Sequence, residues 1–118
     1  VLGSGETLIA PDLVVAEACN AAWKKVRLGE ISPEQGAAVA HAVPVSLDRL
    51  VSAVGLAPPA FALAHRWNHP VYDCFYVALA VEEGAPLVTD DARVLALAKK
   101  AGLSRWVRPL AGFAKPRS

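Results

Sequence analysis

The chain of 118 residues contains no methionine, only two cysteines, and no apolar run close to the roughly 20 residues of a membrane span. The cysteines form no CxxC pair, which leaves the histidines without partners for a zinc site. Two isolated cysteines fit a reducing, cytoplasmic setting. The net charge of +1 excludes recognition of nucleic acid by overall charge alone. Because methionine is absent, we expect the natural protein to continue upstream of Val1.

Glycine-rich phosphate loops and serine elbows are also absent. No GxGxxG, Walker or GxSxG motif occurs, so nothing predicts a dinucleotide site, a P-loop or a hydrolase nucleophile. What the chain does have is 54% hydrophobic and 19% charged residues, which indicate a globular protein with a real core. Without repeats or linkers, we predict a single domain over residues 1–118, with a loose tail at 111–118.

Apolar spacing and capping residues divide the chain into alternating elements. The stretch SPEQ, residues 32–35, carries a capping box with proline at the first helical position, and Pro44 is expected to end that helix. Pro58 and Pro59 are expected to precede another helix. The predicted helices are 11–28, 33–43, 60–69, 70–83 and 91–101; the predicted strands are 8–10, 86–90 and 105–110, and 45–51 has an ambiguous β tendency.

Helices that alternate with short apolar strands predict an α/β fold with a largely parallel sheet. In such sheets, ligands bind beyond the carboxyl ends of the strands. Asp90 and Asp91 follow the predicted strand at 86–90 and therefore stand in that kind of position.

Three carboxylates in this pattern are candidate functional residues. Asp73 lies in an otherwise apolar helix, although an acid in a first turn also interacts favourably with the helix dipole. Glu17 lies mid-helix among apolar neighbours, where a buried carboxylate would need a partner; alternatively, it faces solvent on a stripe with Asn20 and Lys24. Asp91 begins a helix and could simply be its N-cap.

Acids from separated segments could converge at one end of the sheet. Crowded carboxylates repel one another, and a hard divalent cation such as Mg²⁺ or Mn²⁺ removes that penalty through oxygen ligands. Such a cluster supports metal-assisted hydrolysis of a phosphodiester. Two adjacent acids, Asp90 and Asp91, are more than a helix cap needs, and His69 is the histidine placed close to Asp73.

Two motifs in order carry a family resemblance. The stretches LIAPDLVVAEACNAAWKKVRLGEIS and HPVYDCFYVALAVEEGAPLVTDDARV resemble the PIN-domain nucleases, and most closely the VapC-type toxins of bacterial toxin–antitoxin pairs. The resemblance covers residues 8–110 and implies a three-layer α/β/α fold around a mostly parallel sheet. It also implies that this chain lacks the family's first strand and the aspartate that ends it.

The resemblance implies roles for individual residues. Glu17, Asp73 and Asp91 match the acids that ligate the metal and serve catalysis. Thr89 matches the hydroxyl residue that helps to orient the site, and Asp90 matches a variable position beside the ligands. Asn20 is a candidate hydrogen-bond partner of the site. The implied cofactor is Mg²⁺ or Mn²⁺.

The implied activity is that of a cytoplasmic endoribonuclease toxin. RNA would be contacted by Lys24, Arg27 and Arg66, and the expected protein partners are a cognate antitoxin and a second copy of the chain. The missing first aspartate predicts weak metal binding and little activity from these 118 residues alone. The alternatives are an inactive PIN-like module that binds RNA or protein and, less well matched, a phospho-receiver domain.

Overall fold

The computed structural model describes residues 2–3, 8–89 and 91–109. Its helices are α1 (Leu13–Arg27), α2 (Pro33–Ser46), α3 (Ala53–Trp67), α4 (Val71–Glu83), α5 (Ala92–Ala101) and the short 3-10 helix η1 (Ser104–Trp106). Its strands are β1 (Leu2–Gly3), β2 (Leu8–Pro11), β3 (Arg49–Val51), β4 (Leu87–Thr89) and β5 (Val107–Pro109). The predicted tail at 111–118 lies outside the described residues.

The strands form one sheet in the order β3-β2-β1-β4-β5. Strand β2 runs parallel to β3, and β4 runs parallel to β5, whereas β1 is antiparallel to both of its neighbours, β2 and β4. The strands other than β1 therefore point the same way, which confirms the predicted α/β fold with a mostly parallel sheet. The short β1, which runs in the opposite direction, holds the centre of the sheet.

The hydrophobic core lies among α3, α4, α5 and the strands. Helix α4 supplies its centre, because Cys74, Val77, Leu79 and Ala80 are each fully inaccessible to solvent. Residues of α3, α5, β2, β4 and β5 complete the cluster around α4. We call this part of the molecule, which consists of the sheet with α3, α4 and α5, the body.

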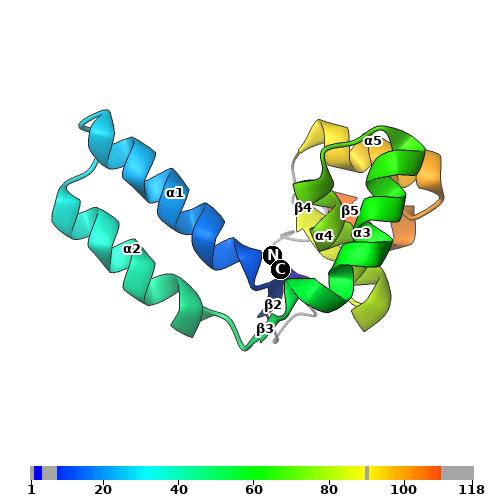
Figure 1. The fold of residues 1–118 in the computed structure, drawn as a ribbon, viewed down its shortest axis with the longest axis horizontal. Coiled ribbons are helices and arrows are strands. Elements are labelled where there is room, and N and C mark those ends of the chain that lie inside the picture. Colours follow the sequence, from blue (N-terminus) through cyan, green and yellow to red (C-terminus); the bar gives the residue numbers. More distant parts are fainter. Residues whose placement is uncertain (1, 4–7, 90, 110–118) are drawn as a thin grey trace, which may run out of the picture.

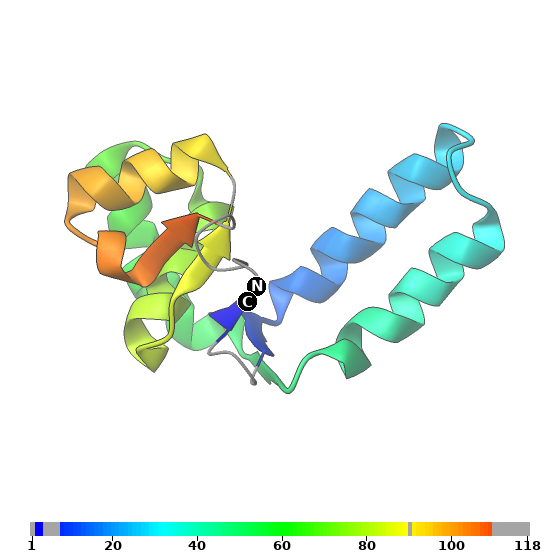
Figure 2. The same cartoon turned by 180° about the vertical axis from the view of Figure 1, so that it is seen from behind.

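Helices α1 and α2 form a hairpin, residues 13–46, that extends away from the body (Figures 1 and 2). No described residue of this hairpin belongs to the core cluster of the body. The predicted capping box is confirmed, because Gln35 N–H donates to Ser32 Oγ over 3.0 Å and Ser32 N–H donates to Gln35 Oε1 over 2.8 Å. Gly29 follows α1 with a φ of 74°, a conformation that glycine adopts without strain.

Several predictions of helix ends from proline were wrong. Pro44 lies inside α2, which continues to Ser46, and Pro58 and Pro59 lie inside α3, which begins at Ala53. Proline removes one donor and clashes with the carbonyl of residue i−4, but this penalty is local and tertiary packing can offset it. In α3 the buried Leu56 anchors the first turns against the core.

Two side chains also cap the start of α3. Ser52 Oγ accepts a hydrogen bond from the N–H of Val54, and Asp12 Oδ1 accepts one from the N–H of Ala53, each over 3.2 Å. Asp12 thus ties the β2–α1 junction to α3, a role that the sequence did not reveal. Pro11, expected in the first helical turn, is instead the last residue of β2 and pairs with Val51.

None of the helices among the described residues is both long and apolar enough to cross a membrane.

Candidate functional site

Glu17 lies on the exposed side of α1, in line with the solvated stripe of the alternative interpretation. Asn20 and Lys24, one and two turns further along α1, are exposed as well. The Glu17 carboxylate is nevertheless engaged, because the phenol of Tyr76 on α4 donates a hydrogen bond of 2.5 Å to its Oε1. This bond joins the hairpin to the body across 59 positions of the sequence.

Tyr76 stands within the electrostatic reach of two of the predicted acids. Burial of its ring, the hydrogen bond to Glu17 and the charges of Glu17 and Asp73 together raise the pKa of Tyr76 well above its usual range. The phenol therefore stays protonated and acts as a donor. Since Asp73 and Tyr76 are three residues apart on α4, they share one face of that helix.

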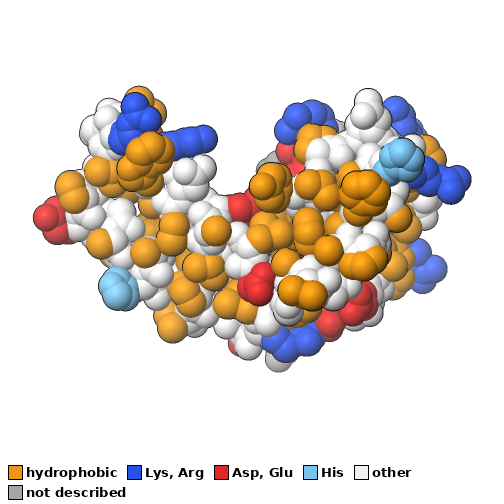
Figure 3. Space-filling model, in the orientation of Figure 1, with side chains coloured by type: hydrophobic (Ala, Val, Ile, Leu, Met, Phe, Trp, Pro, Cys, Tyr) orange, Lys and Arg blue, Asp and Glu red, His pale blue; other side chains and the backbone are white. Residues whose placement is uncertain are grey.

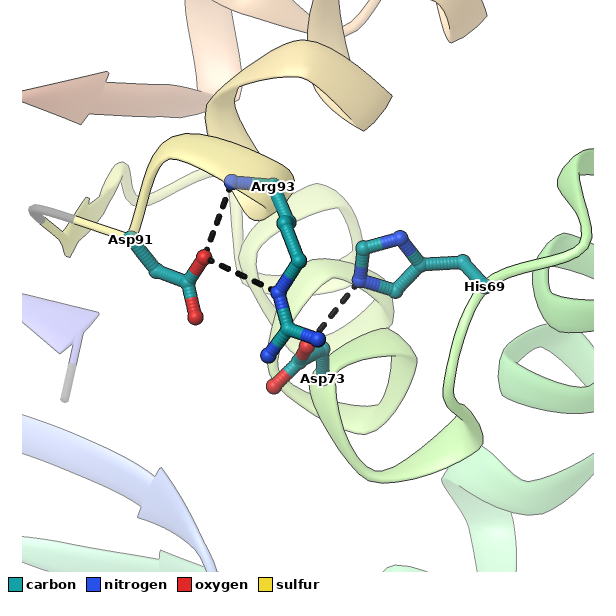
Figure 4. Close-up of polar contacts among 4 residues, drawn as sticks. All are labelled: His69, Asp73, Asp91 and Arg93. Atoms are coloured by element: carbon teal, nitrogen blue, oxygen red, sulfur yellow. Dashed lines mark hydrogen bonds and ion pairs between the residues drawn. The ribbon is translucent and has the colours of Figure 1, made fainter.

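Asp73 lies in the first turn of α4, so the helix-dipole interpretation of its position is consistent with the structure. Its Oδ2 is also 3.0 Å from Nε2 of His69, which precedes α4 (Figure 4). The His69 side chain is 9% exposed and the Asp73 side chain 30% exposed, so the imidazole holds a carboxylate that remains accessible to solvent. His69, noted in the sequence for its proximity, thus orients Asp73.

Asp91 is the N-cap of α5. Its Oδ1 accepts a hydrogen bond of 2.8 Å from the N–H of Arg93 and lies 3.7 Å from Arg93 Nε. The backbone hydrogen bond from Arg93 is the main reason why the pKa of Asp91 is lowered. The side chain of Thr89, and all of Asp90, lie outside the described part of the structure.

The structure relates two of the predicted acids through Tyr76, which donates a hydrogen bond to Glu17 and shares a face of α4 with Asp73. Asp91 lies at the start of α5. Figure 4 shows the side chain of Arg93 between the Asp91 carboxylate and the pair formed by His69 and Asp73.

Carboxylate oxygens are the donors that Mg²⁺ and Mn²⁺ prefer, so the residue types at this site fit such a cation. Within residues 2–3, 8–89 and 91–109, however, no three His, Cys, Asp or Glu side chains come together to hold a metal ion. The described residues alone therefore do not form a complete metal cage.

A pocket with a cavity volume of about 340 Å³ opens between α1 and α4 beside Glu17. Its lining consists of Leu13, Ala16, Glu17 and Asn20 from α1 and Tyr72 from α4. The sequence suggested Asn20 as part of the site but not Tyr72. The position of Tyr72, next to Asp73 and opposite in direction to the buried Cys74 and Val77, was the signal that could have found it.

The basic side chains predicted to contact RNA are exposed. Figure 3 shows a hollow between the hairpin and the body, with acidic side chains at its floor and Lys and Arg side chains on both sides. Lys24 and Arg27 belong to the last turn of α1, and both are exposed. Arg66 is exposed at the end of α3, where its guanidinium lies 5.3 Å from the ring of Trp67.

Comparison with known proteins gives one group of relatives. Ribonuclease VapC1 of Mycobacterium tuberculosis, strains CDC 1551 / Oshkosh and ATCC 25618 / H37Rv, is 39% identical over 88 residues, which are 74% of this chain. The match spans 65% of the length of that relative, a little under two thirds. No protein-family model matches the chain.

Proposed function

We propose that the chain is a VapC-type PIN-domain protein and acts as an endoribonuclease toxin that hydrolyses RNA phosphodiester bonds, because it is 39% identical to Ribonuclease VapC1 over 74% of its length. The observation that carries the proposal is the hydrogen bond from Tyr76 to Glu17, which connects one motif acid on α1 to the helix face that bears another, Asp73. Acids that are far apart in sequence are thereby brought to one side of the junction between hairpin and body.

Each acid has a proposed role. Asp73, oriented by His69, is accessible enough to face a substrate, and Glu17 is held in place by Tyr76. Asp91 adds a carboxylate whose pKa is lowered, so it stays ionised at neutral pH. A divalent cation, Mg²⁺ or Mn²⁺, is proposed as the cofactor of these acids; when bound it would neutralise negative charge at the phosphate.

RNA binding is proposed to rest on local basic groups, because the net charge is only +1. Lys24 and Arg27 extend the stripe of α1 beyond Glu17 and Asn20, and Arg66 lies on the body. Phosphate contacts by these side chains predict that affinity for RNA falls as salt concentration rises.

The direct test is cleavage of single-stranded RNA by a form of the protein that carries the upstream aspartate of the family's first strand. Cleavage is measured with Mg²⁺ or Mn²⁺, with EDTA, and with the variant Asp73→Asn in that form. Cleavage that requires the cation and is lost in Asp73→Asn would support both the activity and the cofactor. Glu82→Gln, an exposed acid on the same helix, is the matched control and should cleave as the wild type does. Full activity in Asp73→Asn would show that the wrong acid has been assigned.

An inactive RNA-binding module is the second candidate function. It is favoured by the finding that the described residues gather no three-ligand cluster. RNA binding without cleavage at any cation concentration, in the form that carries the upstream aspartate, would select it.

We further propose a cognate antitoxin and a second copy of the chain as protein partners in the cytoplasm. Large apolar side chains on the hairpin support protein contacts there, since Trp23 is 54%, Leu28 73% and Val45 82% exposed. Light scattering on the purified chain, alone and with the product of a neighbouring antitoxin gene, tests both partners.

A further inference from the structure

The pocket between α1 and α4 has the features of a subsite for one part of an RNA strand. Three of its lining side chains, Leu13, Ala16 and Tyr72, are apolar or aromatic, and its polar groups are the Glu17 carboxylate and the Asn20 amide. Its volume of about 340 Å³ falls within the range of ~300–1,000 Å³ that is typical of small-ligand sites. An apolar wall with a few polar groups selects a flat, neutral group.

Tyr72 is the pocket residue that indicates which class of ligand binds. Its side chain is 63% exposed although it belongs to a helix with a largely buried face, and no packing requirement explains an aromatic ring there. Unpaired nucleobases stack on exposed aromatic rings, and such stacking tolerates any base because every base has a π-face.

The polar groups of the pocket favour a base over a phosphate. Without a bound cation, the Glu17 carboxylate repels phosphate, and it accepts hydrogen bonds from exocyclic amino groups. The Asn20 amide carries both donors and acceptors, so it can pair with the edge of a base. Lys24, one turn beyond Asn20 on the same exposed stripe, lies where the backbone of the same strand would need a cation.

We propose that this pocket binds a single unpaired nucleobase of the RNA, with Tyr72 as the stacking platform and Asn20 as the group that reads its edge. The inference rests on the proposed function, since it assigns a substrate subsite beside Glu17. It fixes which part of the RNA lies there: a base against Tyr72, with the adjoining backbone directed along α1 toward Lys24.

The test measures binding in the absence of cleavage. Fluorescein-labelled single-stranded RNA pentamers, and abasic pentamers with the same sugar–phosphate backbone, are titrated with the whole chain in EDTA while fluorescence anisotropy is followed. The wild type should bind the base-bearing strand about 10-fold more tightly than the abasic one, in line with a stacking contribution of ~1–3 kcal/mol per base. Tyr72→Ala should remove this preference, and Tyr72→Phe should retain it.

Phe61→Ala is the matched control, because Phe61 is an aromatic residue of α3 with a similar exposure of 66% and lies outside the pocket. It should leave the preference intact, while Asn20→Ala should reduce differences among pentamers of different base. Equal binding of base-bearing and abasic strands by the wild type would overturn the subsite and leave the pocket to a side chain of a protein partner.

Failure of the subsite can be told apart from failure of the nuclease. A chain that prefers base-bearing strands but never cleaves RNA keeps the subsite and loses the proposed activity. A chain that cleaves RNA with Mg²⁺ or Mn²⁺, and whose binding and cleavage are unchanged in Tyr72→Ala, keeps the activity and loses the subsite.

Discussion

The hairpin and the body are stabilised in different ways. The body buries a contiguous cluster of side chains from three helices and the sheet, whereas the hairpin contributes Ala22 as a buried residue of α1 and none from the described α2. The two hairpin helices pack mainly against each other, and at the closest approach a Cβ added to Gly36 would lie 2.8 Å from Val26 Cγ2. The hairpin is thus a peripheral unit with its own small interface.

This difference matters because the candidate site draws on both parts. Glu17, Asn20 and Lys24 belong to the hairpin, whereas Asp73 and Asp91 belong to the body. A body with a large core can hold its acids in place. Glu17 on α1 depends instead on contacts at the junction, and the hydrogen bond from Tyr76 is the contact that involves its carboxylate. Function would therefore depend on how firmly the hairpin is held.

The largest expected effect is on the stability of the body. Leu79→Ala removes a side chain that is 0% exposed at the centre of α4 and should lower the free energy of unfolding by about 2–5 kcal/mol. Val26→Ala, at the half-buried interface of the hairpin, should lower the free energy of unfolding by about 1 kcal/mol or less. Urea denaturation followed by circular dichroism measures both. Equal losses would mean that hairpin and body share one core.

A large effect on activity is expected at the hairpin acid. Glu17→Gln keeps an oxygen that can accept the hydrogen bond from Tyr76 but removes the charge, and it should lower the cleavage rate about 100-fold or more with unchanged stability. Cleavage assays and thermal melts are compared with those of Glu34→Gln, an exposed acid of α2. Wild-type activity in Glu17→Gln would confine the site to the body.

The reactivities of the two cysteines test the body and the hairpin separately, because Cys74 lies in the body and Cys19 in the hairpin. Cys74 is fully buried in α4, and burial, with the charge of Asp73, raises its pKa to about 11 from the ordinary 9.0. At pH 8 its thiolate is therefore about 100-fold scarcer than that of an ordinary thiol, and access is blocked as well. Cys19, half-buried in a groove between α1 and α2, should react with a disulfide reagent first.

The stability of the protein should also depend on pH through Cys74. Because the folded pKa of Cys74 is raised, the unfolded state loses this proton first, and stability should fall as pH rises above about 9 toward 11. Single variants Cys19→Ser and Cys74→Ala assign the reacting thiols. Rapid labelling of Cys74 in the native protein at pH 8 would contradict the rigidity of the body.

The smallest expected effect comes from loosening the junction. Tyr76→Phe removes one phenol O–H and keeps the ring, so the hydrogen bond to Glu17 is lost. If that bond contributes about 1 kcal/mol to transition-state stabilisation, the cleavage rate should fall roughly 5-fold. If the hydrogen bond orients Glu17, the loss should fall on kcat while KM stays nearly constant. Steady-state kinetics decide this. Ser46→Ala, which removes a hydroxyl that donates to the Ala42 carbonyl in α2 away from the site, serves as the control. An unchanged kcat would show that Glu17 is positioned without Tyr76.

Local chemistry was enough to predict much of this protein. The capping box at Ser32 and the helix predicted at 91–101 depend on residues close in sequence, and both were correctly predicted. The motif acids were also recognisable because each keeps a fixed place relative to its own helix or strand. The resemblance to the VapC-type PIN-domain nucleases followed from these local motifs, and the similarity to Ribonuclease VapC1 supports it.

Tertiary structure alone decided the rest. Pro58 and Pro59 were expected to precede a helix, but α3 begins before them, where the buried Leu56 and the cap from the distant Asp12 stabilise its first turns. Pro44 was expected to end a helix but lies inside α2. The direction of β1, the projection of the hairpin and the contact between Tyr76 and Glu17 all depend on segments that meet only after folding. Pairing energies between distant segments leave no periodic trace in the sequence, and for that reason they could not be predicted from it.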